Sequence, residues 1–427
     1  MKENWWEGLE RVGMRPGVER IAALLAQLGD PQTQYPIIHV AGTNGKGSTA
    51  SLVTSALISQ GYRVGLTISP DLGQINERVT INQVPIHPDL WDSLGHEIEA
   101  AGEILDDIPT FFEAVTALAF LAFARQEVDV AVVEVGLGGR LDATNVIPPP
   151  IVSIITPIAF DHQERLGSTI TAIAAEKAGI LKPGTRLVLA KQPFLEAGEV
   201  VRERAESLGI SMVEPRVFGA VDGRGVFWSD PEMGDVTVPL LGAYQVENVA
   251  TARAAIGVLQ ELGWISDIAR VKDAWAEAHW PGRFQVVERD PLWVIDGAHN
   301  PHGVLGLINT LQRRPWNQYR WHLIFGVLSD KPGARMLEAL LPYVESVTLT
   351  QVPSERGADP EPLWEQFQAR KPITVIRDPW DAVRRLQSTV SPGGTQAVLV
   401  CGSLSLLSYL NQRRAFIPLT DSVVEKA

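Results

Sequence analysis

The hydrophobic and polar positions of the chain form two kinds of segment. Short apolar runs predict buried strands, and longer segments between them have apolar residues every three or four positions, which is the period of a helix. The expected strands are 37–41, 64–68, 129–135, 151–156 and 187–190. The expected helices are 49–60, 111–125 and 169–180. This alternation predicts a largely parallel sheet that is covered on both faces.

The pattern changes over residues 217–239. Asp222-Gly223 lies there between apolar runs without a helical period, which predicts a β-hairpin or a small antiparallel sheet. The helical period then resumes over 246–262 and 268–278.

A domain boundary is expected at Trp280-Pro281-Gly282-Arg283, because Pro-Gly breaks a helix and a new series of apolar runs follows. The strands expected after it are 293–295, 321–325, 347–351, 373–376 and 397–401. We therefore predict two α/β domains, residues 1–282 and a smaller one over 283–427.

Composition and charge narrow the class of protein. The chain has 427 residues, of which 45% are apolar and 20% charged, which is typical of a folded enzyme with more than one core. Its formal net charge of −13 argues against an extended basic face. Nucleic acid and anionic membranes are therefore not expected as partners.

Other features favour a cytoplasmic location. Cys401 is the single cysteine, so no internal disulfide can form. Residues 1–11 mix charged residues with tryptophan and lack the apolar stretch of a signal peptide. No run of about 18 uncharged apolar residues predicts a membrane span.

A glycine-rich loop follows the expected strand 37–41 and precedes a helix. Such a loop can curve so that backbone N–H groups and the helix N-terminus surround a phosphate, while a lysine adds positive charge. A hydroxyl at its end can reach a phosphate-bound Mg²⁺ ion. The residues are Gly42, Thr43, Asn44, Gly45, Lys46, Gly47 and Ser48.

The spacing of this loop differs from the common phosphate-binding loop, because the order at its end is Gly-Lys-Gly-Ser. The alternative is a glycine-rich turn with an exposed lysine. The flanking strand and helix favour ATP binding.

The loop and a series of further motifs resemble one family. The motifs occur in the family's order over residues 10–330. They are Ser69-Pro70, Asn76-Glu77-Arg78, Thr110-Phe111-Phe112-Glu113, 134–145, Asp161-His162, 176–180, Tyr244-Gln245 with Asn248, Pro281-Gly282-Arg283 and 296–301. The chain resembles the folylpolyglutamate and dihydrofolate synthases of the Mur-ligase superfamily.

The resemblance implies a fold and a reaction. The fold is a Mur-ligase-like P-loop ATPase domain with a mostly parallel sheet, followed by a smaller Rossmann-like glutamate-ligase domain. The reaction is the ATP-dependent addition of L-glutamate to a tetrahydrofolate, to dihydropteroate, or to both. ATP phosphorylates a carboxylate of the acceptor, and the amine of glutamate then displaces phosphate to leave an amide.

The resemblance also implies a catalytic centre of Lys46, Glu134, His162 and Lys177. Glu134 ends an apolar run, where a buried carboxylate needs a cation. Ser48, Ser69, Glu134 and His162 are the expected Mg²⁺ ligands. The resemblance implies that Lys177 can be carbamylated to help hold a second Mg²⁺ ion.

For each of these residues the sequence leaves a structural alternative open. Glu134 could pair with Arg140, and Lys177 could be solvated or paired with a glutamate. His162 could be an ordinary loop histidine.

The remaining implied sites lie near or beyond the expected boundary. Asn248 is expected near adenine, Arg283 near phosphate, and Asp296 and His299 toward ribose and phosphate. ATP would then lie between the domains, although Asp296-Gly297 alone could be a turn. Asp330, Lys331 and Ser403 are the expected, weaker glutamate contacts, and a solvated turn is the alternative for Asp330-Lys331.

The chain departs from the family at several positions. Asp71 and Ile75 replace the usual histidine and a common aromatic residue, and Ser405 replaces a frequent tyrosine. These departures bear on folate and glutamate recognition rather than on ATP binding.

Two other functions stay open at this point. One is a Mur-type ligase with another acceptor, such as a cell-wall peptide, against which residues 134–145 argue. The other is a switch protein that hydrolyses ATP without joining anything. The expected partners are ATP, L-glutamate and the acceptor, and the family implies a monomer.

Overall fold

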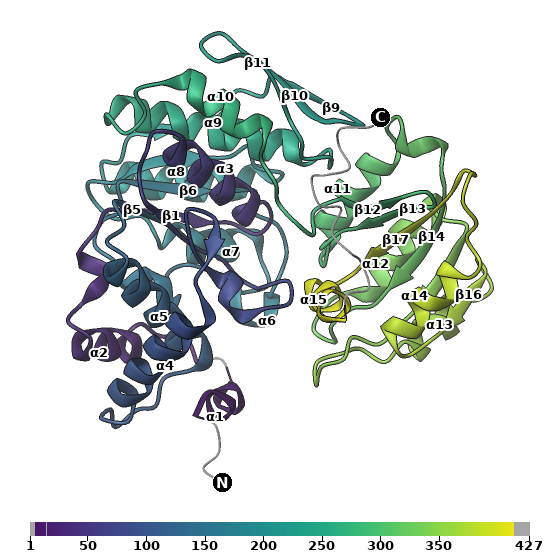
Figure 1. Cartoon of the computed structure of the whole chain (residues 1–427), viewed down its shortest axis with the longest axis horizontal. Coiled ribbons are helices and arrows are strands. Elements are labelled where there is room, and N and C mark those ends of the chain that lie inside the picture. The colour runs from purple at the N-terminus through teal and green to yellow at the C-terminus, as the bar shows by residue number, and fades with distance from the viewer. Residues whose placement is uncertain (1–4, 14, 414–427) are drawn as a thin grey trace.

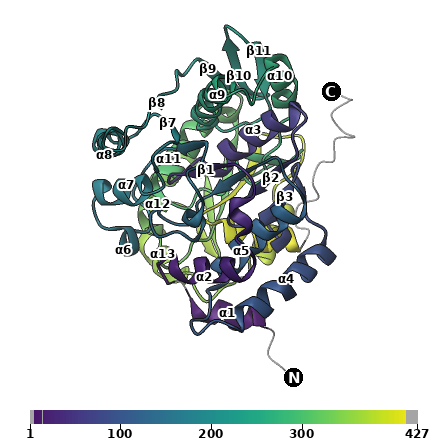
Figure 2. The same ribbon diagram turned by 90° about the vertical axis from the view of Figure 1, so that its left-hand side faces the viewer.

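The computed structural model describes residues 5–13 and 15–413. Residues 1–4 of the N-terminal segment 1–11, which lacks the apolar stretch of a signal peptide, therefore lie outside the described residues. The larger part of the molecule, from purple to teal in Figure 1, carries one sheet, and the smaller part, from green to yellow, carries another. Figure 2 shows the larger part from its outer side.

The larger part is built on an eight-stranded sheet with the order β4-β3-β2-β5-β1-β6-β7-β8. β1 is central and pairs in parallel with β5 and β6, whereas β3 and β4 are antiparallel additions at one edge. The strands are β1 Ile37–Ala41, β2 Val64–Thr67, β3 Val79–Ile81, β4 Val84–Pro85, β5 Val130–Glu134, β6 Val152–Ile155, β7 Arg186–Leu189 and β8 Met212–Val213.

Helices cover both faces of this sheet, and its central strands β1, β5 and β6 are buried at every position. Ile38 and Val40 of β1 pack with α3 (Lys46–Ser59), α9 (Gln245–Glu261) and α10 (Ile268–Ala276). Ile37 faces the opposite core, which contains α2 (Glu19–Gln27), α4 (Pro88–Gly102) and α5 (Phe111–Arg125). The other described helices here are α1 Trp5–Val12, α6 Gln163–Leu166, α7 Ile170–Ala178 and α8 Leu195–Ser207.

The expected antiparallel segment forms a three-stranded sheet of β9 (Gly219–Asp222), β10 (Gly225–Asp230) and β11 (Gly234–Val238). It lies over α9 and α10 in Figure 1, and Trp228 of β10 is buried in the core beneath.

The smaller part is built on a six-stranded sheet with the order β12-β13-β17-β14-β15-β16. Adjacent strands of this sheet are parallel, except that β12 is antiparallel to β13. β12 is an edge strand that the apolar pattern did not predict. Its strands are β12 Gln285–Arg289, β13 Leu292–Ile295, β14 Arg320–Phe325, β15 Ser346–Leu349, β16 Ile373–Val375 and β17 Gln396–Cys401. Its helices are α11 Pro301–Leu311, α12 Gly333–Leu340, α13 Glu361–Phe367, α14 Pro379–Gln387 and α15 Leu404–Gln412.

The predicted fold class is confirmed, since both sheets are parallel-rich and covered by helices. The boundary predicted between residues 282 and 283 lies between α10 and β12. Of the helices in the described residues, none is both long and apolar enough to span a membrane.

Candidate active site

Both sheets direct the carboxyl ends of their parallel strands toward one cavity of about 960 Å³. In open α/β sheets, ligands bind at this end of the strands. Lys46 follows β1, Glu134 ends β5, Asp296 follows β13 and Ser403 follows β17, and all four line the cavity. The sheets thus bring together residues that are far apart in the sequence.

Glycine shapes the phosphate loop at two positions. Gly42 and Gly45 have φ values of +141° and +87°, which residues with side chains rarely adopt. A Cβ on Gly42 would lie 1.9 Å from Thr156 Oγ1, and one on Gly45 would lie 2.2 Å from Asn248 Oδ1. The loop therefore needs glycine for both its curvature and its close packing.

Helix α3 begins at Lys46, three residues before the predicted start at residue 49. The apolar period of this helix begins only after Ser48, because its first turn contains polar and glycine residues. This first turn is also the end of the phosphate loop, so its free N–H groups and the positive end of the helix dipole are available at the loop. This arrangement is suited to binding phosphate.

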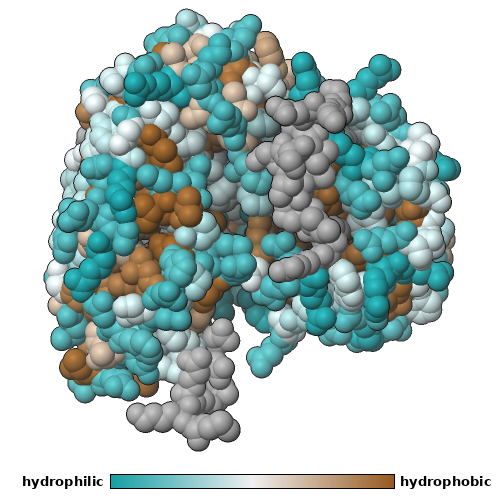
Figure 3. Space-filling view, in the orientation of Figure 1, coloured by the Kyte–Doolittle hydropathy of each residue, from teal (hydrophilic) through white to brown (hydrophobic). Residues whose placement is uncertain are grey.

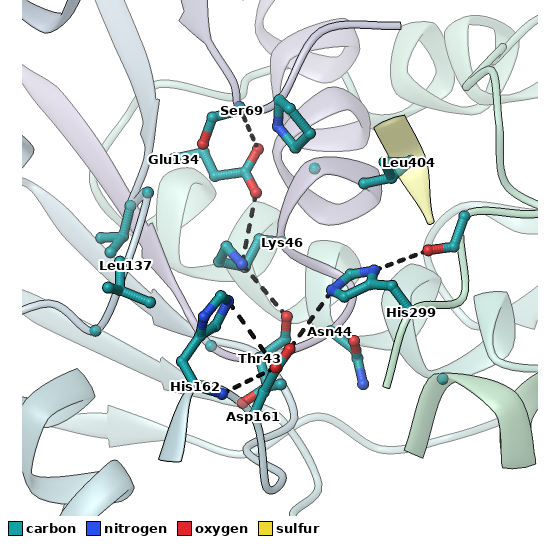
Figure 4. Close-up of a pocket in the computed structure, with 18 of the residues that line it drawn as sticks. Thr43, Asn44, Lys46, Ser69, Glu134, Leu137, Asp161, His162, His299 and Leu404 are labelled. Atoms are coloured by element: carbon teal, nitrogen blue, oxygen red, sulfur yellow. Dashed lines mark hydrogen bonds and ion pairs between the residues drawn. The ribbon is translucent and has the colours of Figure 1, made fainter. Parts of the chain in front are cut away.

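Lys46 and Glu134 form the charged centre of the site, as Figure 4 shows. Lys46 Nζ lies 3.7 Å from Glu134 Oε1 and donates a hydrogen bond to the carbonyl of Thr43 at 3.3 Å. Burial raises the pKa of Glu134, and Lys46 and Arg283 oppose this shift. Arg140 pairs instead with Glu176 at 2.8 Å, so it is not the partner of Glu134.

The donor set fits Mg²⁺. Ser48 Oγ is buried without a hydrogen-bond partner in the described residues, and Glu134 Oε2 accepts a hydrogen bond from the backbone N–H of Ser69 at 3.4 Å. Within the described residues, no group of three or more His, Cys, Asp or Glu side chains could hold a metal by itself. Mg²⁺ commonly takes one or two carboxylates and completes its shell with phosphate and water.

His162 lies beside Asp161 in the loop after β6, in the left-handed region with φ of 49°. Burial lowers the pKa of His162 to about 4. Its imidazole is therefore neutral at pH 7, which is the form that binds metals. Asp161 was not among the predicted site residues, although it lines the cavity and contacts both His162 and His299 (Figure 4).

Lys177 is buried beneath the phosphate loop, near the end of α7, and its Nζ donates a hydrogen bond to the carbonyl of Gly42 at 2.8 Å. Burial, followed by repulsion from Lys46, lowers the pKa of Lys177 to about 7. Its contact with Gly42 is not the pairing with a glutamate that the sequence left open.

The expected nucleotide contacts converge from both domains. Tyr244 at the start of α9 donates a hydrogen bond to Asp296 Oδ2 at 2.6 Å, and the backbone N–H of Phe284 donates to the same oxygen at 2.8 Å. Burial raises the pKa of Asp296, whereas Tyr244 and Arg283 lower it. Arg283 and Asn248 also line the cavity, where the sequence had predicted them. Tyr244 appeared only in a motif, because its contact with Asp296 joins residues of different domains.

The three weaker glutamate contacts occupy different surroundings. Ser403 is buried at the start of α15, where its Oγ accepts a hydrogen bond from the N–H of Ser405. Lys331 lines the cavity and pairs with Asp161 at 2.5 Å. Asp330 is not among the described residues that line the cavity, and its carboxylate pairs with Arg356 at 2.6 Å. Glutamate binding by these residues stays a prediction.

One end of the cavity is apolar and aromatic. Phe111 and Phe112 at the start of α5 line it, together with Leu9 of α1. The Arg78 guanidinium lies 5.7 Å from the centre of the Phe111 ring and is held by Asp71 Oδ2 at 2.7 Å. Figure 3 shows apolar residues on the middle of the visible face of the larger lobe.

Comparison with known proteins agrees with this geometry. Residues 40–256 match the model of the Mur ligase middle domain, and residues 282–404 match that of the Mur ligase glutamate ligase domain. A Bacillus subtilis dihydrofolate synthase/folylpolyglutamate synthase is 35% identical, and the alignment covers 96% of this chain and 97% of that protein.

The chain belongs to the folylpolyglutamate and dihydrofolate synthase family of Mur ligases.

Solved members of this family have the same fold. The Mycobacterium tuberculosis folylpolyglutamate synthase, complexed with ADP and AMPPCP, has a TM-score of 0.88 at 33% identity, with 96% of this chain and 98% of that chain covered. Escherichia coli FolC, in complex with DHPP and ADP, has a TM-score of 0.84 at 30% identity and covers 96% of this chain and 98% of its own.

Proposed function

We propose that this enzyme uses ATP to add L-glutamate to a folate, extending tetrahydrofolate polyglutamates, converting dihydropteroate to dihydrofolate, or both. ATP-dependent ligation is the activity of its family. The observation that carries the proposal is that one cavity joins the phosphate loop and the buried Glu134 to an aromatic end beside Arg78. Such a cavity can hold a triphosphate and a flat acceptor next to each other.

The reaction has two steps. An oxygen of the acceptor carboxylate attacks the γ-phosphorus of ATP, and the bond between this phosphorus and the β,γ-bridging oxygen breaks to release ADP. The glutamate amine then attacks the acyl carbon, gives up a proton, and displaces phosphate with its electron pair. Both reacting oxygens of the first step are anionic, so positioned positive charge supplies much of the catalysis.

The cavity offers this charge from both domains. Lys46 and Arg283 are the cations for the phosphates, and the free N–H groups of α3 bind phosphate oxygens. Thr43, Asn44 and the three glycines of the loop hold the shape of this cradle. Asn248, Asp296 and His299 are proposed to contact the rest of the nucleotide.

Ser48, Ser69, Glu134 and His162 are the proposed Mg²⁺ ligands. The ion would neutralise charge that develops on the phosphates during transfer. The buried Ser48 oxygen without a hydrogen-bond partner in the described residues supports its part in this set.

Lys177 suits carbamylation. Only a neutral amine attacks carbon dioxide, and a pKa of about 7 leaves a large neutral fraction at neutral pH. A carbamate at Nζ would carry negative charge next to Lys46, which now repels the ammonium form. We propose that this carbamate helps to hold a second Mg²⁺ ion.

The aromatic end is the proposed acceptor site. Phe111 and Phe112 offer flat apolar surface to a pteridine ring, and offset stacking of such rings stabilises the pair. Arg78 could meet a carboxylate of the acceptor, and its charge is partly balanced by Asp71.

Our proposal also includes a domain boundary between residues 282 and 283 and a monomeric enzyme in the cytoplasm. The compartment is inferred from the single cysteine, Cys401.

The test is ADP release by the purified enzyme with MgATP and L-glutamate. Three reactions are compared, with dihydropteroate, with tetrahydrofolate and without acceptor. Turnover with either pteridine, together with formation of the amide, supports the proposal and identifies the acceptor. ADP release that does not depend on acceptor or glutamate would contradict it and favour an ATP-hydrolysing switch.

A further inference from the structure

Asp161 contacts the second domain from a loop of the first. This loop connects β6 to α6, and the Asp161 side chain is only 7% exposed. Asp161 Oδ1 accepts a hydrogen bond from Lys331 Nζ at 2.5 Å, and Oδ2 accepts one from Asn300 Nδ2 at 2.9 Å. His299 Nε2 lies 3.5 Å from Oδ2. The carboxylate therefore has a partner from the second domain on each oxygen.

The partners come from two separate segments of the second domain. His299 and Asn300 lie at the start of α11, and Lys331 follows β14. One carboxylate on the first domain thus fixes both segments. A single buried charge with several partners defines relative position more sharply than one exposed pair does.

Asn300 links this contact to the phosphate loop. Its Oδ1 accepts a hydrogen bond from the N–H of Gly303 and caps α11, which orients the side-chain amide. Asn300 Nδ2 then reaches both Asp161 and Asn44 Oδ1, the latter at 3.0 Å, and Asn44 Nδ2 returns a hydrogen bond at 3.1 Å. A shift of α11 would therefore disturb the phosphate loop as well.

The ion pair between Asp161 and Lys331 is buried only while the two domains are docked against each other. The Lys331 side chain is 5% exposed, and a buried ammonium or carboxylate without a partner is costly. Separating the domains would break the ion pair between Asp161 and Lys331 and expose both side chains to water.

We propose that Asp161 is a positioning residue at which the second domain docks against the phosphate loop, and that Lys331 is its counter-ion rather than a ligand of glutamate. The arriving amino acid would have to displace a buried carboxylate to reach Lys331. This role replaces the glutamate contact that the sequence predicted for Lys331. The tests of this role that measure amide formation rest on the proposed function.

The experiment is a double-mutant cycle with Asp161→Asn, Lys331→Met and the double variant. Asparagine keeps an oxygen for Asn300, and methionine keeps the length of lysine without its charge. Glu338→Gln is the matched control, because Glu338 pairs with Arg370 at 2.8 Å on the surface of the second domain. Thermal unfolding first establishes that each variant is folded, and Lys331→Gln, which also removes the charge, replaces Lys331→Met if that variant is not.

We expect each single variant to lower kcat by about 10- to 100-fold, and the double variant to lose little more than either one. The KM for L-glutamate should stay within about twofold of the wild-type value. The amount of ADP released per amide should rise, since a poorly docked second domain admits water to the acyl phosphate. The control should match the wild type.

Two results would overturn the proposal. One is a large rise in the KM for L-glutamate with Lys331→Met at unchanged kcat, which would make Lys331 a glutamate ligand. The other is strictly additive losses, which would mean that the two residues act independently.

A second measurement does not depend on the ligase activity. Small-angle X-ray scattering with Mg²⁺ and AMPPCP should show a larger radius of gyration for Asp161→Asn than for the wild type, and equal radii would contradict docking through Asp161. If the wild type forms no amide but the radii differ, the proposed function fails while the docking role stands.

Discussion

The two domains contribute to the cavity in different ways. On the first domain, Lys46 is the first residue of α3 and Glu134 is the last residue of β5, so the backbone of regular elements places both. On the second domain, His299, Asn300 and Lys331 lie on loops and helix starts and meet partners on the first domain. The first set is held within one domain, whereas the second depends on how the domains meet.

This difference predicts different effects of substitutions in the two domains on catalysis, on nucleotide affinity and on the coupling of ATP use to amide formation. The first domain holds Gly42 of the phosphate loop against its own Thr156 and Lys177, whereas Asn44 of the loop also bonds to Asn300 of the second domain. The second domain completes the site only when it docks. We therefore expect the largest losses of kcat from changes on the first domain, and smaller losses of kcat, with altered nucleotide affinity and altered coupling of ATP use to amide formation, from changes on the second.

The largest effect is expected for Lys46→Ala. The lysine acts on charge that develops between phosphates, so kcat should fall about 1000-fold while circular dichroism stays that of the wild type. ADP release in the presence of acceptor and glutamate measures it. Lys371→Ala is the control, since Lys371 does not line the cavity. Unchanged turnover would remove the phosphate-loop argument.

Glu134→Gln should lower kcat by about 100-fold, because the amide is a poor Mg²⁺ ligand and carries no charge. A titration of activity with Mg²⁺ should show only partial rescue. Glu214→Gln, which changes an exposed glutamate of the same domain, should behave as the wild type. A fully active Glu134→Gln enzyme would contradict the metal role.

Arg283→Ala tests the second domain's side of the cavity. We expect the KM for ATP to rise about tenfold, with a much smaller change for the acceptor, because a charged hydrogen bond to phosphate is lost. Initial rates at varied ATP and varied acceptor measure the two constants. Arg289→Ala, an exposed arginine of β12, is the control. A larger effect on the acceptor would place Arg283 in the acceptor site.

The smallest effect is expected on the pH dependence of unfolding, for which one histidine of each sheet is compared. Burial lowers the pKa of His39 in β1 to about 3 from an ordinary value of 6.5. As the pH falls, His39 therefore binds a proton in the unfolded chain before it does so in the folded protein. The free energy of unfolding has its full value above pH 6.5 and falls by ~1.4 kcal/mol per pH unit between pH 6.5 and pH 3. His39→Gln should flatten the dependence of urea unfolding on pH between these values.

His322 in β14 is the matched histidine of the second sheet. It is only half-buried, and burial lowers its pKa less sharply. His322→Gln should therefore change the acid dependence of unfolding less than His39→Gln does. An equal or larger change would show that His39 does not account for the acid sensitivity of the first sheet.

Much of the fold could be predicted because apolar periodicity reports burial directly. The central strands β1, β5 and β6 were found within a residue or two, since they are buried on both faces. β12 was missed because its residues are partly exposed on an edge, where burial leaves no continuous apolar run. The start of α3 was placed too late because a phosphate loop uses glycine and polar residues where an ordinary helix would be apolar.

The sequence by itself determined the phosphate loop, the buried carboxylate at the end of β5 and the family, because each depends on residues that are close together or in a fixed order. Only the tertiary structure decided that Asp161 meets Lys331 and Asn300, and that Asp330 pairs with Arg356 instead of lining the cavity. These contacts join segments more than a hundred residues apart or depend on the direction of one side chain. Chain order carries no information about either, because burial and charge pairing are settled only when the two sheets pack around one cavity.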